Sequence, residues 1–231
     1  MLELNNISKT FNAGTVNQKV ALNGLNLTMN EGDFVTVIGG NGAGKSTMLN
    51  AIAGVFQVDT GKILIDGVDV TALPEYKRAK YIGRVFQDPM MGTAATMQIE
   101  ENLALAARRG KPRTLRPGIT KADREFYKEQ LRILDLGLED RMTTKVGLLS
   151  GGQRQALTLL MATLQQPKLL LLDEHTAALD PKTAAKVLEA TQRIVERNHL
   201  TTMMITHNMR DAISYGNRLI ISGFCIISQG N

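Results

Sequence analysis

A glycine-rich segment that joins an apolar run to a helical pattern constrains this chain more than any other feature. Residues 34–38 form a short continuous apolar run, which is typical of a buried strand, and the letters GGNGAGKST follow at once. Apolar residues then recur with helical spacing at Met48, Leu49 and Ile52, and Gly54 is well placed to end that helix. The order strand, loop, helix predicts an α/β fold with an anion site, because backbone N–H groups at a helix N-terminus favour negative charge.

The loop also matches the P-loop pattern G-x-x-x-x-G-K-S, in the strand-to-helix context that this pattern requires. Glycines let backbone N–H groups approach a polyphosphate closely, Lys45 reaches the β- and γ-phosphates, and Ser46 supplies a hydroxyl to Mg²⁺. A glycine-rich turn that binds nothing is the alternative, and the complete match disfavours it. The predicted nucleotide-binding residues are Gly39, Gly40, Asn41, Gly42, Ala43, Gly44, Lys45, Ser46 and Thr47.

Two adjacent carboxylates follow a second apolar run. Residues 169–172 are four leucines, typical of a buried strand, and Asp173 and Glu174 come directly after them. Ligands of open α/β sheets bind at the carboxyl ends of the strands. We therefore expect Asp173 to hold Mg²⁺, directly or through water, and Glu174 to orient or deprotonate the attacking water. Two acids at a strand end are common in themselves, and the P-loop makes hydrolysis the favoured interpretation.

The letters LSGGQ, residues 149–153, open another helical pattern and again offer N–H groups, a hydroxyl and glycines to an anion. The order P-loop, LSGGQ, apolar run ending in Asp-Glu, and histidine after the next strand resembles the ATP-binding cassette (ABC) family over essentially the whole chain. This resemblance implies an Mg²⁺-dependent ATPase with ATP as its nucleotide. It also implies that two copies pair, so that one subunit's signature residues complete the partner's ATP site: Ser150, Gly151, Gly152 and Gln153.

Four further site residues are implied by the resemblance. Phe11 looks like the aromatic that stacks on adenine, with core packing at a strand end as the alternative. Gln87 looks like the glutamine that contacts Mg²⁺ or the lytic water and senses the membrane partner, and His207 like the histidine on the γ-phosphate. Asp180 resembles a residue of the loop that crosses the dimer interface, and it is also placed to cap a helix that starts at Pro181.

One position departs from the family pattern. His175 stands where the family usually has proline, and it either loosens the turn or adds a polar contact.

The remaining pattern predicts a single ABC ATPase domain, residues 1–231. Its nucleotide-binding core, 1–89 and 167–231, is expected to be a mostly parallel P-loop sheet with an N-terminal antiparallel β part and a closing hairpin at 219–221 and 225–227. Strand patterns fade over 90–166, where helical patterns predict an inserted signature subdomain. The predicted helices there cover 99–108, 120–136 and 151–164.

Charge and cysteine content restrict the alternatives only loosely. The net charge of +5 favours anionic partners without choosing among them. Basic residues gather over 108–124, and we interpret them as a solvated loop, with an acidic lipid or protein surface as the alternative. The lone cysteine, Cys225, excludes an internal disulfide and fits a buried position in a reducing cytosol. We find neither a secretory signal nor an apolar stretch long enough to span a bilayer.

The function favoured by the resemblance is ATP-driven solute transport, in the uptake direction, through a separate membrane permease. The implied partners are a second ABC ATPase, the permease and an extracytoplasmic solute-binding protein, and the implied location is the cytoplasmic face of the membrane. Parts of the sequence look similar to bacterial systems that handle amino acids. The alternative is an ABC ATPase that regulates a non-transporting membrane complex. Nucleic-acid binding is not expected, because no aromatic-interleaved basic surface or binding motif is present.

Overall fold

The computed structural model describes residues 1–111, 118–221 and 225–228, the last four as backbone. Two compact units divide the chain, the first covering 1–83, 168–173 and 200–231 and the second 84–167 and 174–199. Predicted features that fall on 112–117, and the burial predicted for Cys225, lie outside what is described. Helix α6 (Pro181–Asn198) belongs to the second unit, a grouping that the sequence pattern did not indicate.

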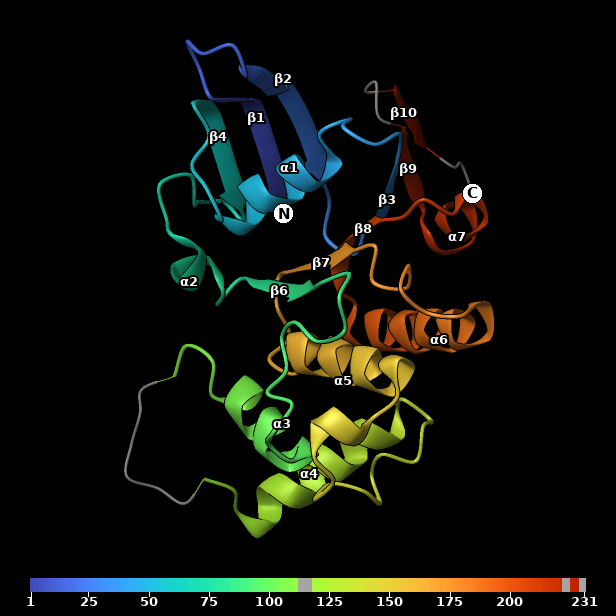
Figure 1. The fold of residues 1–231 in the computed structure, drawn as a ribbon. Coiled ribbons are helices and arrows are strands. Elements are labelled where there is room, and N and C mark those ends of the chain that lie inside the picture. The colour runs from blue at the N-terminus through green and yellow to red at the C-terminus, as the bar shows by residue number, and fades with distance from the viewer. Residues whose placement is uncertain (112–117, 222–224, 229–231) are drawn as a thin grey trace. The chain divides into compact units, whose positions relative to one another are not determined.

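The first unit contains an antiparallel sheet in the order β2-β1-β4-β5 and most of a six-stranded sheet in the order β10-β9-β3-β8-β7-β6 (Figure 1). Strands β3, β8, β7 and β9 pair in parallel, while β9 and β10 form the expected antiparallel closing hairpin. The elements are β1 Leu2–Phe11, β2 Lys19–Met29, β3 Phe34–Ile38, α1 Lys45–Ala53, β4 Thr60–Ile65, β5 Val68–Asp69, α2 Glu75–Arg78, β7 Leu169–Asp173, β8 Thr201–Ile205, α7 Met209–Tyr215, β9 Arg218–Ile221 and β10 Cys225–Ser228, with β6 Ile82–Val85 at the border of the units.

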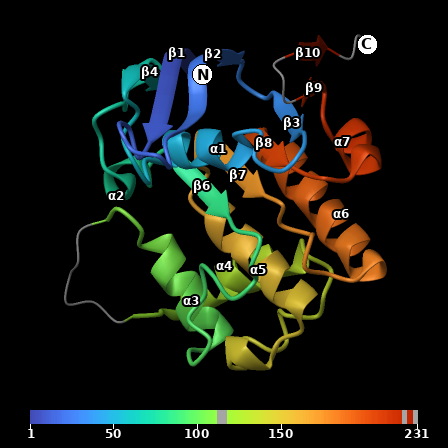
Figure 2. The ribbon, with the colours of Figure 1, turned by 45° about the horizontal axis from the view of Figure 1, so that its top comes forward.

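One hydrophobic core joins the two sheets of the first unit. Helix α1 contacts both β2 and β7, and Figure 2 shows it between the antiparallel strands and the parallel ones. Strands β3, β7 and β8 are buried along nearly their whole length and mostly apolar, as expected for parallel strands covered on both faces, although Thr36, Thr201 and Thr202 are buried among them. The core residues include Leu4, Ile52, Ile63, Leu171 and Met203. This packing holds the loop between β3 and α1 on a rigid base.

Arg78 ties the end of α1 to the segment after β5, through two backbone carbonyls of each. Its side chain is 1% exposed, and its guanidinium donates to the carbonyls of Ala51 and Ile52, at 2.7 and 2.9 Å, and to those of Thr71 and Leu73. Carbonyls in the last turn of a helix lack the usual intrahelical partner, and Arg78 supplies donors to two of them, in addition to the Gly54 N–H that also bonds the Ala51 carbonyl.

The second unit is helical in its packing. Helix α5 contacts α3, α4 and α6, and α3 contacts α4. Its elements are α3 Ile99–Ala107, α4 Lys121–Arg132, η1 Val146–Leu148, α5 Gly151–Thr163 and α6 Pro181–Asn198. The helix predicted over 120–136 is shorter, because the chain turns at Asp135 and Gly137, which both have positive φ.

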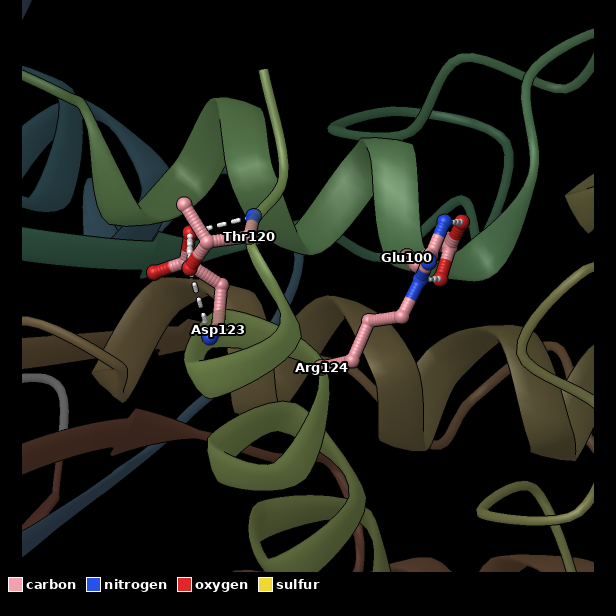
Figure 3. Close-up of polar contacts among 4 residues, drawn as sticks. All are labelled: Glu100, Thr120, Asp123 and Arg124. Carbon is pink, nitrogen blue, oxygen red and sulfur yellow. Dashed lines mark hydrogen bonds and ion pairs between the residues drawn. The ribbon is translucent and has the colours of Figure 1, made fainter. Parts of the chain in front are cut away.

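The start of α4 is closed by a capping box, in which Thr120 and Asp123 bond each other's backbone N–H groups (Figure 3). The next residue, Arg124, donates two guanidinium hydrogen bonds, of 2.8 and 2.9 Å, to the buried carboxylate of Glu100 on α3. At least this part of the basic stretch is therefore a structural link between two helices, and not only a solvated surface.

Candidate functional site

The predicted P-loop connects the end of β3 to the N-terminus of α1, as its sequence pattern requires. Gly44 lies before α1 with φ 83°, and a Cβ atom there would lie 2.7 Å from the Ala21 carbonyl oxygen, so only glycine fits. No side chain caps the first turn of α1. Lys45 is 7% exposed, and its Nζ donates to the carbonyls of Gly39 and Gly40, at 2.6 and 2.9 Å. The lysine is therefore folded over its own loop, while Ser46 is exposed at the helix start.

Three neighbouring parallel strands bring further predicted residues to the same edge of the sheet. Strand β8 lies between β3 and β7, and its Ile205 is in register with Val37 of β3 and with Asp173 at the end of β7. His207 follows β8 and is exposed. The P-loop, Asp173 and His207 thus all lie at carboxyl strand ends, where open α/β sheets bind ligands.

Phe11 ends β1 and is half-buried. Its ring packs edge-to-face on Phe56, with centroids 5.3 Å apart, and Lys9 Nζ lies 5.7 Å from each ring centroid. The contact with Phe56 accords with the core-packing alternative, and stacking on adenine stays a prediction.

Glu174 and the turn after it belong to the second unit. Glu174 has φ 48°, a left-handed conformation that is uncommon for a residue with a side chain. His175 is 1% exposed, and its Nε2 lies 3.1 Å from the Thr191 hydroxyl on α6. The added polar contact considered for His175 is therefore present. Burial lowers the pKa of His175 to about 4, so the ring is neutral near pH 7.

Gln87 is exposed in the loop after β6. The loop is fastened to α5, because Gln155 Nε2 donates to the Phe86 carbonyl at 2.8 Å and Arg154 contacts the Met90 sulfur. The sequence reasoning missed both anchors. A polar residue on a helix that is otherwise buried is the signal for Gln155, which is completely buried.

The signature residues form the N-terminus of α5. Ser150 and Gln153 make a capping box, with both hydrogen bonds at 3.2 Å. Gly152 packs against α6 so closely that a Cβ atom would overlap the Thr183 methyl group. This glycine therefore has a packing role, and its role in letting a nucleotide approach stays a prediction.

Asp180 caps α6, as the sequence predicted, by accepting a 3.1 Å hydrogen bond from the Thr183 backbone N–H. Hydrogen bonds from the Thr183 side chain and backbone hold the pKa of Asp180 below its usual range. The cap does not depend on a partner subunit, so a role in the dimer interface stays a prediction.

Within the described residues, no three His, Cys, Asp or Glu side chains form a group that could hold a metal ion. This accords with the predicted Mg²⁺ site, because Mg²⁺ on a nucleotide takes one or two protein oxygens and completes its shell with phosphates and water. Ser46, at the start of α1, and Asp173, at the end of β7, are the predicted oxygen ligands, and that role stays a prediction. Among the helices of the described residues, none combines the length and the hydropathy needed to cross a membrane.

Comparison with known proteins identifies the family. The ABC transporter family profile matches residues 22–177. A tyrosine transport ATP-binding protein of Clostridioides difficile is 44% identical over 96% of this chain and 88% of its own length. The spermidine/putrescine import ATP-binding protein PotA of Haemophilus influenzae is 33% identical over 96% of this chain, which spans 55% of that relative.

Solved structures agree with this assignment. The ATP-binding cassette MJ0796, solved as a dimer in a post-hydrolysis state with ADP and Pi, is 31% identical and has a TM-score of 0.80. The match covers 96% of this chain and 94% of that one. The predicted fold class, a P-loop core with a parallel sheet and an antiparallel β part, is thereby confirmed. This chain belongs to the ABC transporter family, as an ATP-hydrolysing, nucleotide-binding subunit.

Proposed function

We propose that two copies of this chain close around two Mg²⁺-ATP molecules and that hydrolysis drives the uptake of a small solute through a separate membrane permease. The observation that carries the proposal is the sheet edge where the P-loop, Asp173 and His207 meet at three parallel strand ends. A cationic side chain, a carboxylate and an imidazole at one edge suit a polyphosphate with its metal ion.

Each residue of this edge has a distinct task in the proposal. Lys45 leaves its loop carbonyls to bind the β- and γ-phosphates when nucleotide enters. Ser46 and Asp173 would hold Mg²⁺, which would supply positive charge to offset the charge of the phosphates. His207 donates to the γ-phosphate, and Glu174 accepts a proton from the attacking water. Gln87, which is exposed, contacts the metal or the water and reports to the permease.

The signature residues serve the partner's nucleotide. Ser150 and Gly151 are exposed at the start of a 13-residue helix, where N–H groups and the helix dipole favour phosphate. Pairing of two copies is supported by the dimeric cassette to which this chain is similar, and the proposal adds that these residues face the partner's P-loop. Loss of the γ-phosphate removes contacts on both sides, so hydrolysis weakens the dimer.

Uptake as the direction, and an amino acid as the substrate, are proposed from relatives. Their printed functions are tyrosine transport and the import of spermidine or putrescine, methionine and phosphonates. The most similar of these is the tyrosine protein, which this chain matches nearly end to end. An extracytoplasmic solute-binding protein and a location at the cytoplasmic face of the membrane belong to the same proposal.

The test is to trap the ATP-bound dimer and identify what it holds. Tagged Glu174→Gln is expressed in the native cells, extracted in detergent with ATP and analysed by mass spectrometry, with Lys45→Ala as the control in which ATP binding is weakened. We expect a polytopic permease and a solute-binding protein with Glu174→Gln, together with ATP-dependent dimerisation that Lys45→Ala lacks. Recovery of only soluble or cell-wall proteins would contradict the transport proposal, and rapid hydrolysis by Glu174→Gln would remove Glu174 from its task.

A further inference from the structure

His175, the residue after the proposed catalytic carboxylate, makes a buried hydrogen bond to helix α6. His175 and Thr191 are each 1% exposed, and 3.1 Å separate the ring Nε2 from the hydroxyl oxygen. An apolar side chain would fill the space without the cost of burying an imidazole. The volume of the site therefore does not by itself explain a polar side chain at position 175.

The direction of this hydrogen bond follows from the next contact. The Thr191 hydroxyl lies 2.8 Å from the Val187 carbonyl, one turn earlier on α6, and donates its single proton to that oxygen. Toward His175 the hydroxyl is thus an acceptor, so the ring carries its proton on Nε2. The imidazole is held in one tautomer and one orientation by the middle of a helix.

This anchor lies at the start of a strained turn. Glu174 adopts φ 48°, and a left-handed conformation at a residue with a side chain persists only where surrounding contacts impose it. The Glu174 carbonyl accepts a 2.9 Å hydrogen bond from Ala177, and Asp180 caps α6 at the far end of the segment. The His175 side chain ties the beginning of the turn to the body of α6.

Taking Glu174 as the catalytic base proposed above, we infer that His175 is a positioning residue, which aims the Glu174 carboxylate through its hydrogen bond to Thr191. A carboxylate displaced by a fraction of an ångström still lets ATP bind, because the P-loop makes the phosphate contacts. It loses alignment with the attacking water, and misplacement by about 1 Å is known to slow reactions by up to roughly 100-fold. The effect therefore falls on kcat and not on KM.

The experiment compares matched pairs in the purified full chain. Thr191→Ser keeps the hydroxyl and Thr191→Val replaces it with a methyl group of the same shape. We expect Thr191→Val to lower kcat about tenfold relative to Thr191→Ser, with KM for Mg²⁺-ATP within about twofold. The second pair makes the same comparison at the other partner, because His175→Gln offers an amide donor where Nε2 was and His175→Leu offers none.

A double-mutant cycle separates positioning from general stability. In a Glu174→Gln background the carboxylate is gone, so Thr191→Val is expected to leave the residual rate unchanged. Equal kcat values in both pairs, with only the melting temperature lowered, would reduce His175 to a packing role and overturn the inference. Wild-type turnover by Glu174→Gln alone would instead remove the proposed base, whatever the two pairs show.

Discussion

Acidification is expected to weaken the fold through one buried imidazole. His175 lies 1% exposed against α6, and burial lowers its pKa from 6.5 to about 4. In the unfolded chain the ring is in water and regains its ordinary pKa. Between pH 6.5 and pH 4 the unfolded state therefore binds more protons than the folded state. The stability that this group contributes is complete above pH 6.5 and is lost as the pH falls toward and through 4.

The size of the loss follows from the two pKa values. They differ by about 2.5, from 6.5 to about 4, and each unit corresponds to about 1.36 kcal/mol. Integrating over pH gives a loss of about 2 kcal/mol at pH 5 and about 3 kcal/mol at pH 4, relative to neutral pH. Because the ring is almost completely buried, solvent screening does not reduce this figure.

The assay is urea unfolding at several pH values, with His175→Gln as the reference, so that the protonation of carboxylates cancels in the difference. The free energy of unfolding of the wild type, minus that of His175→Gln, should fall by about 3 kcal/mol from pH 7 to pH 4. His199→Asn alters a histidine at an exposed helix end and should keep the wild-type dependence. A difference that stays constant over this range would refute a neutral, buried His175.

Three further outcomes are expected. Arg78→Leu removes the buried guanidinium donor of four backbone carbonyls and should destabilise the chain by about 3 kcal/mol in urea unfolding, whereas Lys77→Leu, next to it and exposed, should change little. Gly152→Ala should lower the melting temperature, and adding Thr183→Ser, which removes the overlapping methyl group, should restore it without restoring ATPase activity. If the double variant recovers activity too, Gly152 serves packing alone. Lys45→Ala should weaken Mg²⁺-ATP binding, measured by titration calorimetry, roughly 10- to 100-fold, and unchanged affinity would exclude its proposed phosphate contacts.

Local patterns were sufficient for the elements around the P-loop. The apolar run 34–38 has the bounds of β3, the glycine after α1 ends that helix, and Asp180 with Pro181 begins α6. Each of these signals acts within a few residues, through side-chain burial, left-handed glycine geometry or a helix cap. The sequence therefore determined the family, the nucleotide loop and the edge of the sheet to which it belongs.

Elements with weaker local signals were less well predicted. Strand β1 was anticipated only as part of an antiparallel region, because its alternation is broken and its pairing with β2 shifts register between Leu4 and Thr10. The short helix α7 was missed. Both depend on neighbours in the sheet, and α7 lies against β3, about 170 residues earlier in the chain.

Only the tertiary structure decided which distant side chains hold the site residues. Gln155 reaches the Phe86 carbonyl across 69 positions, and His175 reaches Thr191 across 16. The sequence determined which residues carry the chemistry, because P-loop, strand-end acids and LSGGQ are contiguous patterns. It did not determine what orients them, because those contacts arise between helices and loops whose packing depends on the shape and burial of the whole second unit.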